Sequence, residues 1–230
     1  MIPWLGTNDP FPPVEQAARH PNGLLAAGGD LSVARLTEAY GRGIFPWFNE
    51  DQPILWWCPD PRMVLFPHEL KVSRSLRKTL RSARFDIRAD TAFHEVIQQC
   101  RTPREQQDGT WITARMVEAY CEMHRKGHAH SVETWLDGKL VGGLYGIALG
   151  RAFFGESMFT RVTDASKVAL VSLVRQLELW GFGLVDCQMN TPHLASFGAR
   201  EIPRAEFTRR LRELIHYPAV PAPWRLAPSQ

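Results

Sequence analysis

The stretch between Phe153 and Gln188 constrains the fold of this chain most, because its hydrophobic pattern changes from strand to helix and back. It begins with the letters FFGESMF, which continue a strand predicted over 152–154. Apolar residues then recur at helical spacing over 164–180, and two glycines end this helix. The letters LVDCQ at 184–188 predict a short, mostly buried strand. This succession indicates a mixed α/β fold.

Three polar side chains in this stretch are the candidate catalytic residues. Glu156 stands among apolar or small residues, and an ionised carboxylate is rarely buried without a partner or a ligand cation. Asp186 and Gln188 are two residues apart on a strand and should point to the same face. We expect the three to line one cleft, although capped, solvated strand ends are an equal alternative for any one alone. The floor of that cleft is expected to be Phe153, Met158 and Leu170.

Composition sets the broad class of the protein. The 230 residues suit one large domain or two small ones, and 44% hydrophobic with 22% charged residues is ordinary for a soluble globular protein. The net charge of +3 is too mild to indicate a polyanionic partner without local clustering. Four dispersed cysteines fit neither a zinc site nor a disulfide framework, so reduced thiols in the cytoplasm are expected. No signal peptide or membrane span is expected.

The first third of the chain predicts a small domain. A proline-rich arm over 1–23 is followed by a helix near 33–41, capped by Asp30 or Ser32. Aromatic-dense, proline-interrupted stretches come next, and further prolines place a domain junction near residue 62. We therefore expect a small N-terminal domain over 1–62 and a larger domain over 63–230.

The clearest charge signal lies between residues 71 and 88, where seven cations accompany a single carboxylate. On a helix that begins at Ser73, cations every three or four residues would form one basic face. Such a stripe is expected of a protein that binds a phosphate backbone, and a solvated surface helix is the alternative. The candidate contacts are Lys71, Arg74, Arg77, Lys78, Arg81 and Arg84.

The rest of the larger domain predicts helices and a strand meander. Helices are expected over 91–100 and 114–126, then strands over 131–135 and 140–149 joined by an Asp-Gly turn. A last helix is expected over 204–215, with an irregular tail after it. His124, His128 and His130 near Glu133 invite a metal interpretation, but the spacing lacks a zinc pattern and we expect no metal.

Several of these strings resemble one known family. FPWF at 45–48, TWIT at 110–113, GHAHSVE at 127–133, LVGGLYG at 140–146 and the 153–188 stretch are similar, in order, to the leucyl/phenylalanyl-tRNA–protein transferases. The match runs from about Pro21 to Arg204. These bacterial enzymes move Leu or Phe from a charged tRNA to a protein that begins with Arg or Lys. The resemblance implies an acetyltransferase-like (GNAT) core with a mixed sheet flanked by helices, no cofactor and no metal.

The resemblance also implies roles for individual residues. Trp47 and Trp111 would hold the terminal adenosine, Glu156 and Asp186 would attract the cationic acceptor, and Gln188 with Asp186 would orient its amine. The basic stripe would contact tRNA. The pocket for the donor's apolar side chain would consist of Tyr120, Leu144, Phe153, Met158, Leu170, Leu173 and Leu177. Met is expected as a weaker donor, degradation by the N-end rule as the consequence, and a monomer as the state.

Two other functions stay open from the residues. An acetyl-CoA-dependent GNAT enzyme would need a glycine-containing pyrophosphate loop before the long helix. The loop here, Arg161 to Ser166, has no glycine, and Asp164 would repel phosphate. A non-catalytic tRNA-binding module would explain the basic stripe and the tryptophans, but not the polar cluster beside an apolar pocket.

Overall fold

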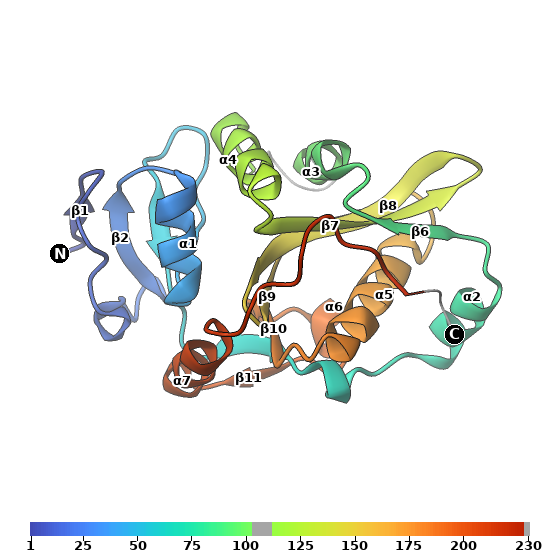
Figure 1. Cartoon of the computed structure of the whole chain (residues 1–230). Helices are drawn as coiled ribbons and strands as arrows, with labels where there is room; N and C mark the ends of the chain where they lie inside the picture. The colour runs from blue at the N-terminus through green and yellow to red at the C-terminus, as the bar shows by residue number, and fades with distance from the viewer. Residues whose placement is uncertain (103–111, 228–230) are drawn as a thin grey trace.

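The computed structural model describes residues 1–102 and 112–227. Within this part of the chain the strands form a four-stranded sheet near the N-terminus and a seven-stranded sheet in the remainder. Helices α3 (Phe93–Arg101) and α4 (Ala114–Arg125) lie on one face of the larger sheet, and α5 (Ala165–Leu179) lies on the other (Figure 1). This arrangement confirms the expected α/β class, with a mixed sheet flanked by helices.

The small sheet is built from the aromatic and proline-rich N-terminal stretches. Helix α1 (Val33–Gly41) packs beside it and begins at Ser32, whose hydroxyl accepts a hydrogen bond from the backbone N–H of Arg35. The predicted helix is thereby confirmed. In spatial order the strands are β1 (Trp4–Leu5), β2 (Leu24–Gly28), β4 (Leu55–Trp57) and β3 (Phe45–Pro46).

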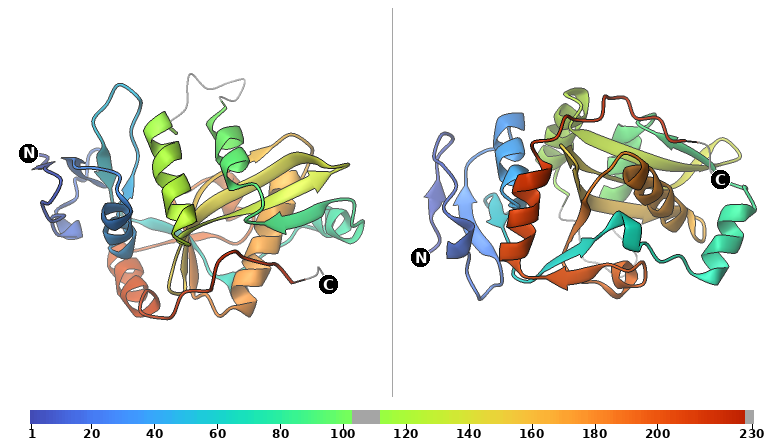
Figure 2. Two further views of the ribbon diagram at one scale, coloured as in Figure 1. Left: turned by 45° about the horizontal axis from the view of Figure 1, so that its top comes forward. Right: turned by 60° about the horizontal axis from the view of Figure 1, so that its bottom comes forward.

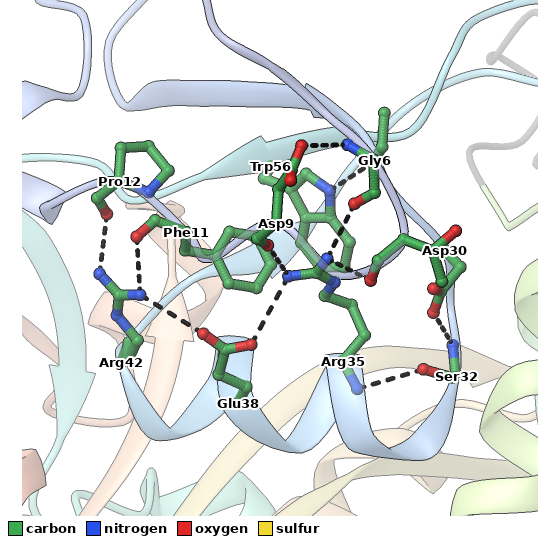
Figure 3. Close-up of polar contacts among 12 residues, drawn as sticks. Gly6, Asp9, Phe11, Pro12, Asp30, Ser32, Arg35, Glu38, Arg42 and Trp56 are labelled. Carbon is green, nitrogen blue, oxygen red and sulfur yellow. Dashed lines mark hydrogen bonds and ion pairs between the residues drawn. The ribbon is translucent and has the colours of Figure 1, made fainter.

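Arg35 of α1 and Arg42, which directly follows the helix, hold the proline-rich arm in place (Figure 3). The buried Arg35 guanidinium donates to the carbonyls of Asp9 at 2.7 Å, Gly6 at 3.0 Å and Thr7 at 2.7 Å. The half-buried Arg42 donates to the carbonyls of Phe11 and Pro12. The two guanidinium groups thus supply hydrogen-bond donors to backbone carbonyls of an irregular segment that has no strand partner.

Arg35→Ala is expected to lower the free energy of unfolding by about 3 kcal/mol, because it leaves three carbonyl acceptors without their charged donor. Arg42→Ala, which removes two hydrogen bonds to carbonyls and a long one to Glu38 at a more exposed position, is the matched control and should cost less. Chemical denaturation of both variants measures the difference. Equal losses, or no loss for Arg35→Ala, would contradict the assignment.

The larger sheet runs through the middle of the molecule (Figure 2). Neighbouring strands are antiparallel except β9 and β10, which are parallel. In spatial order the strands are β11 (Arg200–Ile202), β5 (Arg62–Leu65), β10 (Leu184–Gln188), β9 (Ala152–Thr160), β8 (Lys139–Leu149), β7 (Ala129–Leu136) and β6 (Asp86–Ala89).

Most predicted elements of the larger domain are confirmed, including α5 and the last helix, α7 (Arg204–Leu214). The predicted strand over 152–154 was too short, since β9 continues to Thr160. The expected basic helix, α2 (Arg74–Arg81), begins after Ser73 as predicted but ends before Arg84. Sequence analysis did not predict β5, β6, β11, the short helix α6 (Pro192–Ala195) or the 3-10 turns at Val14–Gln16 and Pro67–Glu69.

Two hydrophobic clusters fill the two faces of the larger sheet. One joins α3 and α4 to the small sheet and α1, so that the N-terminal part and the larger sheet share a continuous core. The other lies between the sheet and α5. A domain junction at residue 62 therefore stays a prediction. No helix within the described residues is long and apolar enough to cross a membrane.

Candidate active site

The candidate site opens where the two parallel strands of the larger sheet separate. Pairing of β9 with β10 extends from Ala152 opposite Leu184 to Phe154 opposite Asp186. Beyond that point β9 continues, whereas β10 ends at Gln188, whose backbone has φ 61°. A cavity of about 1020 Å³ lies at this separation and is lined by residues of both strands.

Each of these strands carries a bulge beside the cavity. Ser157 lies opposite Tyr145 and Gly155 opposite Gly146, which leaves Glu156 as the extra residue of β9. Asp186 and Gln188 lie opposite neighbouring residues of β5 in the same way, so Cys187 is the extra residue of β10. Bulges redirect side chains and are common beside active sites.

The β9 bulge explains how the apolar floor forms. Phe153 and Met158 are five positions apart, so a regular strand would direct them to opposite faces. With the extra residue between them, both pack in the hydrophobic cluster of α5, whereas Phe154 and Phe159 pack in the cluster of α3 and α4. Glu156 itself points to the tyrosines of α1 and α4.

Glu156 is 9% exposed and is surrounded by hydrogen-bond partners. Tyr40 Oη lies 2.7 Å from Oε1, Tyr120 Oη lies 2.9 Å from Oε2, and the two hydroxyls are 2.5 Å apart. Gln188 Nε2 donates to Oε1 at 3.0 Å. The two hydroxyls donate to the carboxyl oxygens and also lie within hydrogen-bond distance of each other, so the carboxyl and the two tyrosines form a closed triangle.

The pKa of Glu156 is raised. Burial raises the pKa from its ordinary value of 4.5 to about 7, against the opposing effect of the tyrosine hydrogen bonds. The nearby Asp186 carboxylate adds to the rise and the Gln188 hydrogen bond opposes it, so the value of about 7 is the net result of all these effects. A cavity carboxyl with a pKa near 7 is able to take up and release a proton at physiological pH.

Asp186 is fully buried and bound by an arginine of the neighbouring strand. Arg62 Nε donates to Oδ1 at 2.8 Å and Nη2 donates to Oδ2 at 2.6 Å. The guanidinium also lies over the rings of Phe45 and Phe207. Oδ1 accepts a second hydrogen bond from the backbone N–H of Gln188 at 2.9 Å. The charge of Asp186 is thus compensated within the chain, and its contacts hold Gln188.

The structure brings most of the residues expected around the donor side chain to the same cavity. Its apolar lining includes Leu144, Phe153, Met158, Leu170 and Leu173, beside Glu156, Asp186 and Gln188. Two expected members lie elsewhere. Tyr120 is buried behind Glu156, and Leu177, one helical turn beyond Leu173, is buried outside the lining.

Of the two tryptophans expected to hold the adenosine, Trp47 lies at the edge of the cavity. It is 38% exposed, and its ring stands 5.5 Å from that of Trp57. The Trp57 indole N–H donates to the Trp47 carbonyl at 2.7 Å and supports this position. Trp111 falls outside the described residues.

The expected basic stripe is present on a shorter helix. Arg74, Lys78 and Arg81 line a shallow hollow on α2, where they are exposed. Arg84 lies beyond the helix, because Ala83 adopts φ 48°, and it donates to the carbonyl of Thr163. This hydrogen bond, with Thr79 Oγ1 donating to Asp164, joins α2 to the loop that precedes α5.

Two residues that contact the candidate catalytic carboxyls, Arg62 and Tyr40, were not predicted from the sequence. Sequence analysis placed Arg62 at the end of the N-terminal domain, and it placed Tyr40 in a predicted helix without a role. The signal for Arg62 was a lone cation that directly precedes the apolar letters MVLF. No signal in the sequence indicated that Tyr40 contacts Glu156, which is 116 residues away. Among the described residues, no group of His, Cys, Asp and Glu is arranged to bind a metal ion.

Comparison with known proteins identifies the family. A model of the leucyl/phenylalanyl-tRNA protein transferase matches residues 64–212, and a model of the N-terminal domain of the same transferase matches residues 29–60. A GCN5-related N-acetyltransferase-like protein from Streptococcus suis aligns with a TM-score of 0.33 at 13% identity, over 74% of this chain and 63% of its own.

Relatives that carry the name leucyl/phenylalanyl-tRNA–protein transferase cover nearly all of the sequence. The relative from Nitrosospira multiformis is 64% identical over 94% of this chain and 94% of its own length. That from Nitrosomonas europaea is 63% identical over 97% and 95%, and that from Thiobacillus denitrificans 65% identical over 93% and 94%. By its sequence and its matched domains, this chain belongs to the leucyl/phenylalanyl-tRNA–protein transferase family of aminoacyltransferases.

Proposed function

We propose that the protein transfers leucine or phenylalanine, and less efficiently methionine, from aminoacyl-tRNA to proteins that begin with Arg or Lys. The product would be a substrate for degradation by the N-end rule. The observation that carries the proposal is a single cavity in which an apolar wall meets the Glu156–Gln188 pair. Family membership supports the reaction class.

The apolar wall suits the donor side chain. Leu144, Phe153, Met158, Leu170 and Leu173 offer no charge or hydrogen bond with which to select a polar group. Such a pocket distinguishes apolar side chains only weakly, since one methylene changes specificity by about 10–200-fold. Leu, Phe and Met are therefore accepted together, and charged or strongly polar donors are rejected by the cost of desolvation.

The reaction is aminolysis of an ester. The acceptor's α-amine attacks the carbonyl carbon, a C–N bond forms, and the C–O bond to the ribose breaks. The attacking amine loses a proton and the leaving ribose oxygen gains one. An α-ammonium group has an ordinary pKa of about 8, so a Glu156 carboxylate with a pKa of about 7 is matched to receive that proton.

Gln188 and Asp186 have positioning roles in this proposal. Gln188 Nε2 is engaged with Glu156, which leaves the amide oxygen to accept a hydrogen bond from the acceptor amine. Asp186 holds the backbone of Gln188 through Oδ1 while Arg62 compensates its charge. Orientation of two bound reactants alone supplies about 7–11 kcal/mol in well-oriented cases.

The basic residues suit the tRNA. The hollow formed by Arg74, Lys78 and Arg81 lies on a helix that contacts the loop before α5. Arg161 of that loop and Lys167 in the first turn of α5 line the cavity itself. A line of cations from α2 to the cavity would follow the phosphate backbone of a charged tRNA towards its aminoacyl end.

Arg74→Ala, Lys78→Ala and Arg81→Ala together should weaken tRNA binding and reduce the slope of log affinity against log salt by about one unit for each phosphate that is no longer neutralised. A matched triple variant at the exposed Arg175, Arg209 and Arg212 has the same change in net charge. Filter binding at several salt concentrations measures both slopes. Equal slopes in the two triple variants would remove α2 from the tRNA interface.

The function is tested by transfer of labelled Leu or Phe from charged tRNA to a peptide that begins with Arg, with an Ala-starting peptide as control. Label in the Arg peptide alone supports the proposal. Binding of charged tRNA without transfer would instead indicate a tRNA-binding module. Absence of both would direct attention to acetyl-CoA as donor.

A further inference from the structure

The C-terminal tail, which the proposed reaction does not use, packs against the apolar wall of the cavity. It leaves α7 and crosses the larger sheet towards the end of α5 (Figures 1 and 2). We call residues 218–227 the C-terminal strap. Its irregular sequence offers no secondary structure that would hold it, so its contacts decide where it lies.

Three polar contacts attach the strap. The backbone N–H of Trp224 donates to Asp90 Oδ2 at 2.7 Å, and the backbone N–H of Ala227 donates to Gln176 Oε1 at 2.6 Å. At the other end, Arg151 donates to the carbonyl of Pro218. Gln176 is a buried residue of α5, the helix that also supplies Leu170 and Leu173 to the cavity.

The Trp224 side chain fills the space between the sheet and the end of α5. It is 2% exposed and stacks on His130 of β7, with ring centroids 3.7 Å apart and planes within 4°. Trp180, just after α5, stands edge-on at 4.9 Å. The Phe153 ring lies 6.0 Å away, tilted by 39°. Trp224 therefore packs beside Phe153 in the same hydrophobic cluster.

Phe153 also packs closely against Gly146 of β8, which has no side chain. A Cβ on Gly146 of β8 would stand 2.5 Å from Phe153 Cζ, so the ring occupies space that only glycine leaves free. The ring is thus fixed between Gly146 and Trp224 while it lines the cavity. Close packing of this kind transmits a change in the volume of one side chain to its neighbours.

We infer that Trp224 is a positioning residue that sets the depth of the donor pocket by fixing Phe153, and thereby the preference between leucine and the longer phenylalanine. The inference rests on the proposed function and assigns part of its donor specificity to the strap. A smaller residue at 224 gives Phe153 room to move away from the cavity, which deepens the pocket and favours phenylalanine.

The test compares kcat/KM for tRNA charged with Phe and with Leu in Trp224→Phe. We expect the Phe-to-Leu ratio to rise by about tenfold, the lower end of what one methylene changes in an apolar pocket. Trp180→Phe is the matched control, because Trp180 packs in the same cluster with no ring contact to Phe153 among the described residues. Its ratio should stay that of the wild type.

A Phe153→Leu background shows whether the effect passes through Phe153. There, Trp224→Phe should change the ratio by less than about twofold, the limit of additivity for uncoupled sites. An unchanged ratio in the single variant, or an equal change in both backgrounds, would overturn the inference. If the wild type transfers neither residue, the proposed function fails. The Kd values of Leu- and Phe-adenosine amides then provide the same ratio without turnover.

Discussion

Asp186→Ala is expected to lower the free energy of unfolding by about 3–5 kcal/mol, because it leaves the Arg62 guanidinium buried without its counter-charge. Both side chains are fully buried and joined by two hydrogen bonds, so no solvent is available to replace the missing carboxylate. Arg62 Nη1 already lacks a partner among the described residues. Removal of Asp186 would leave the whole buried guanidinium without a hydrogen-bond partner.

The double variant Arg62→Met/Asp186→Leu separates stability from activity. Replacement of both charges by apolar side chains removes the cost of desolvation, and buried ion pairs replaced in this way are often neutral or more stable. Denaturation should therefore show that most of the stability is regained. Transfer should not return, because the backbone N–H of Gln188 still lacks its acceptor at Asp186.

The control is Glu213→Ala, which breaks an exposed ion pair with Arg209 on α7 and should change stability by less than about 1 kcal/mol. A double variant that transfers like the wild type would show that Asp186 has no part in positioning Gln188. A single Asp186→Ala variant as stable as the wild type would contradict the buried pair itself.

The sequence alone predicted those elements whose hydrophobic periodicity is unbroken. α1, α3, α4 and α5 each carry an apolar stripe with a recognisable beginning or end, and their positions are confirmed. β5 was missed because all four of its residues are buried and one of them is Arg62, so it shows no alternation. β11 is too short for any pattern to appear.

Backbone features without a sequence signature account for the other differences. α2 ends where Ala83 takes up a left-handed conformation, although alanine offers no reason to expect one. The extra residue at Glu156 interrupts the alternation of β9, which made a long strand look short. Glu156 at this bulge contacts Tyr40 and Tyr120, which are far away in the chain.

The candidate site was predictable as a set of residue types but not as a set of partners. An isolated acid at 156 and two polar residues at the end of a buried strand drew attention to Glu156, Asp186 and Gln188 without any structure. That one carboxyl would meet tyrosines follows only from the packing of α1 and α4 beside β9, and that the other would meet an arginine follows only from the pairing of β5 with β10. The different roles of the two carboxyls could therefore be assigned only from the structure.

Glu156→Gln is expected to lower kcat/KM for transfer by about 100-fold or more, the usual contribution of a general base. The variant keeps the shape of the side chain and removes its ability to take a proton from the acceptor amine. Wild-type kcat/KM should rise with pH around a midpoint near 7, the pKa of the buried carboxyl, and this step should be absent in the variant. A pH profile measured with one acceptor peptide tests both expectations.

The same substitution should change how stability depends on pH. The raised pKa means that the folded chain binds the Glu156 proton more tightly than the unfolded chain does. The contribution of Glu156 to stability therefore falls by about 3 kcal/mol as pH rises from 4.5 to 7, and this contribution is absent in Glu156→Gln. Glu133→Gln is the matched control for the pH dependence of transfer, because Glu133 is a buried carboxyl of the same sheet whose pKa is also raised by burial but which lies outside the cavity lining. It should leave the pH dependence of transfer unchanged.

A fully active Glu156→Gln variant that also loses the pH-dependent step in stability would mean that the Glu156 carboxyl titrates as described. The acceptor amine would then give its proton to the ribose hydroxyl or to water.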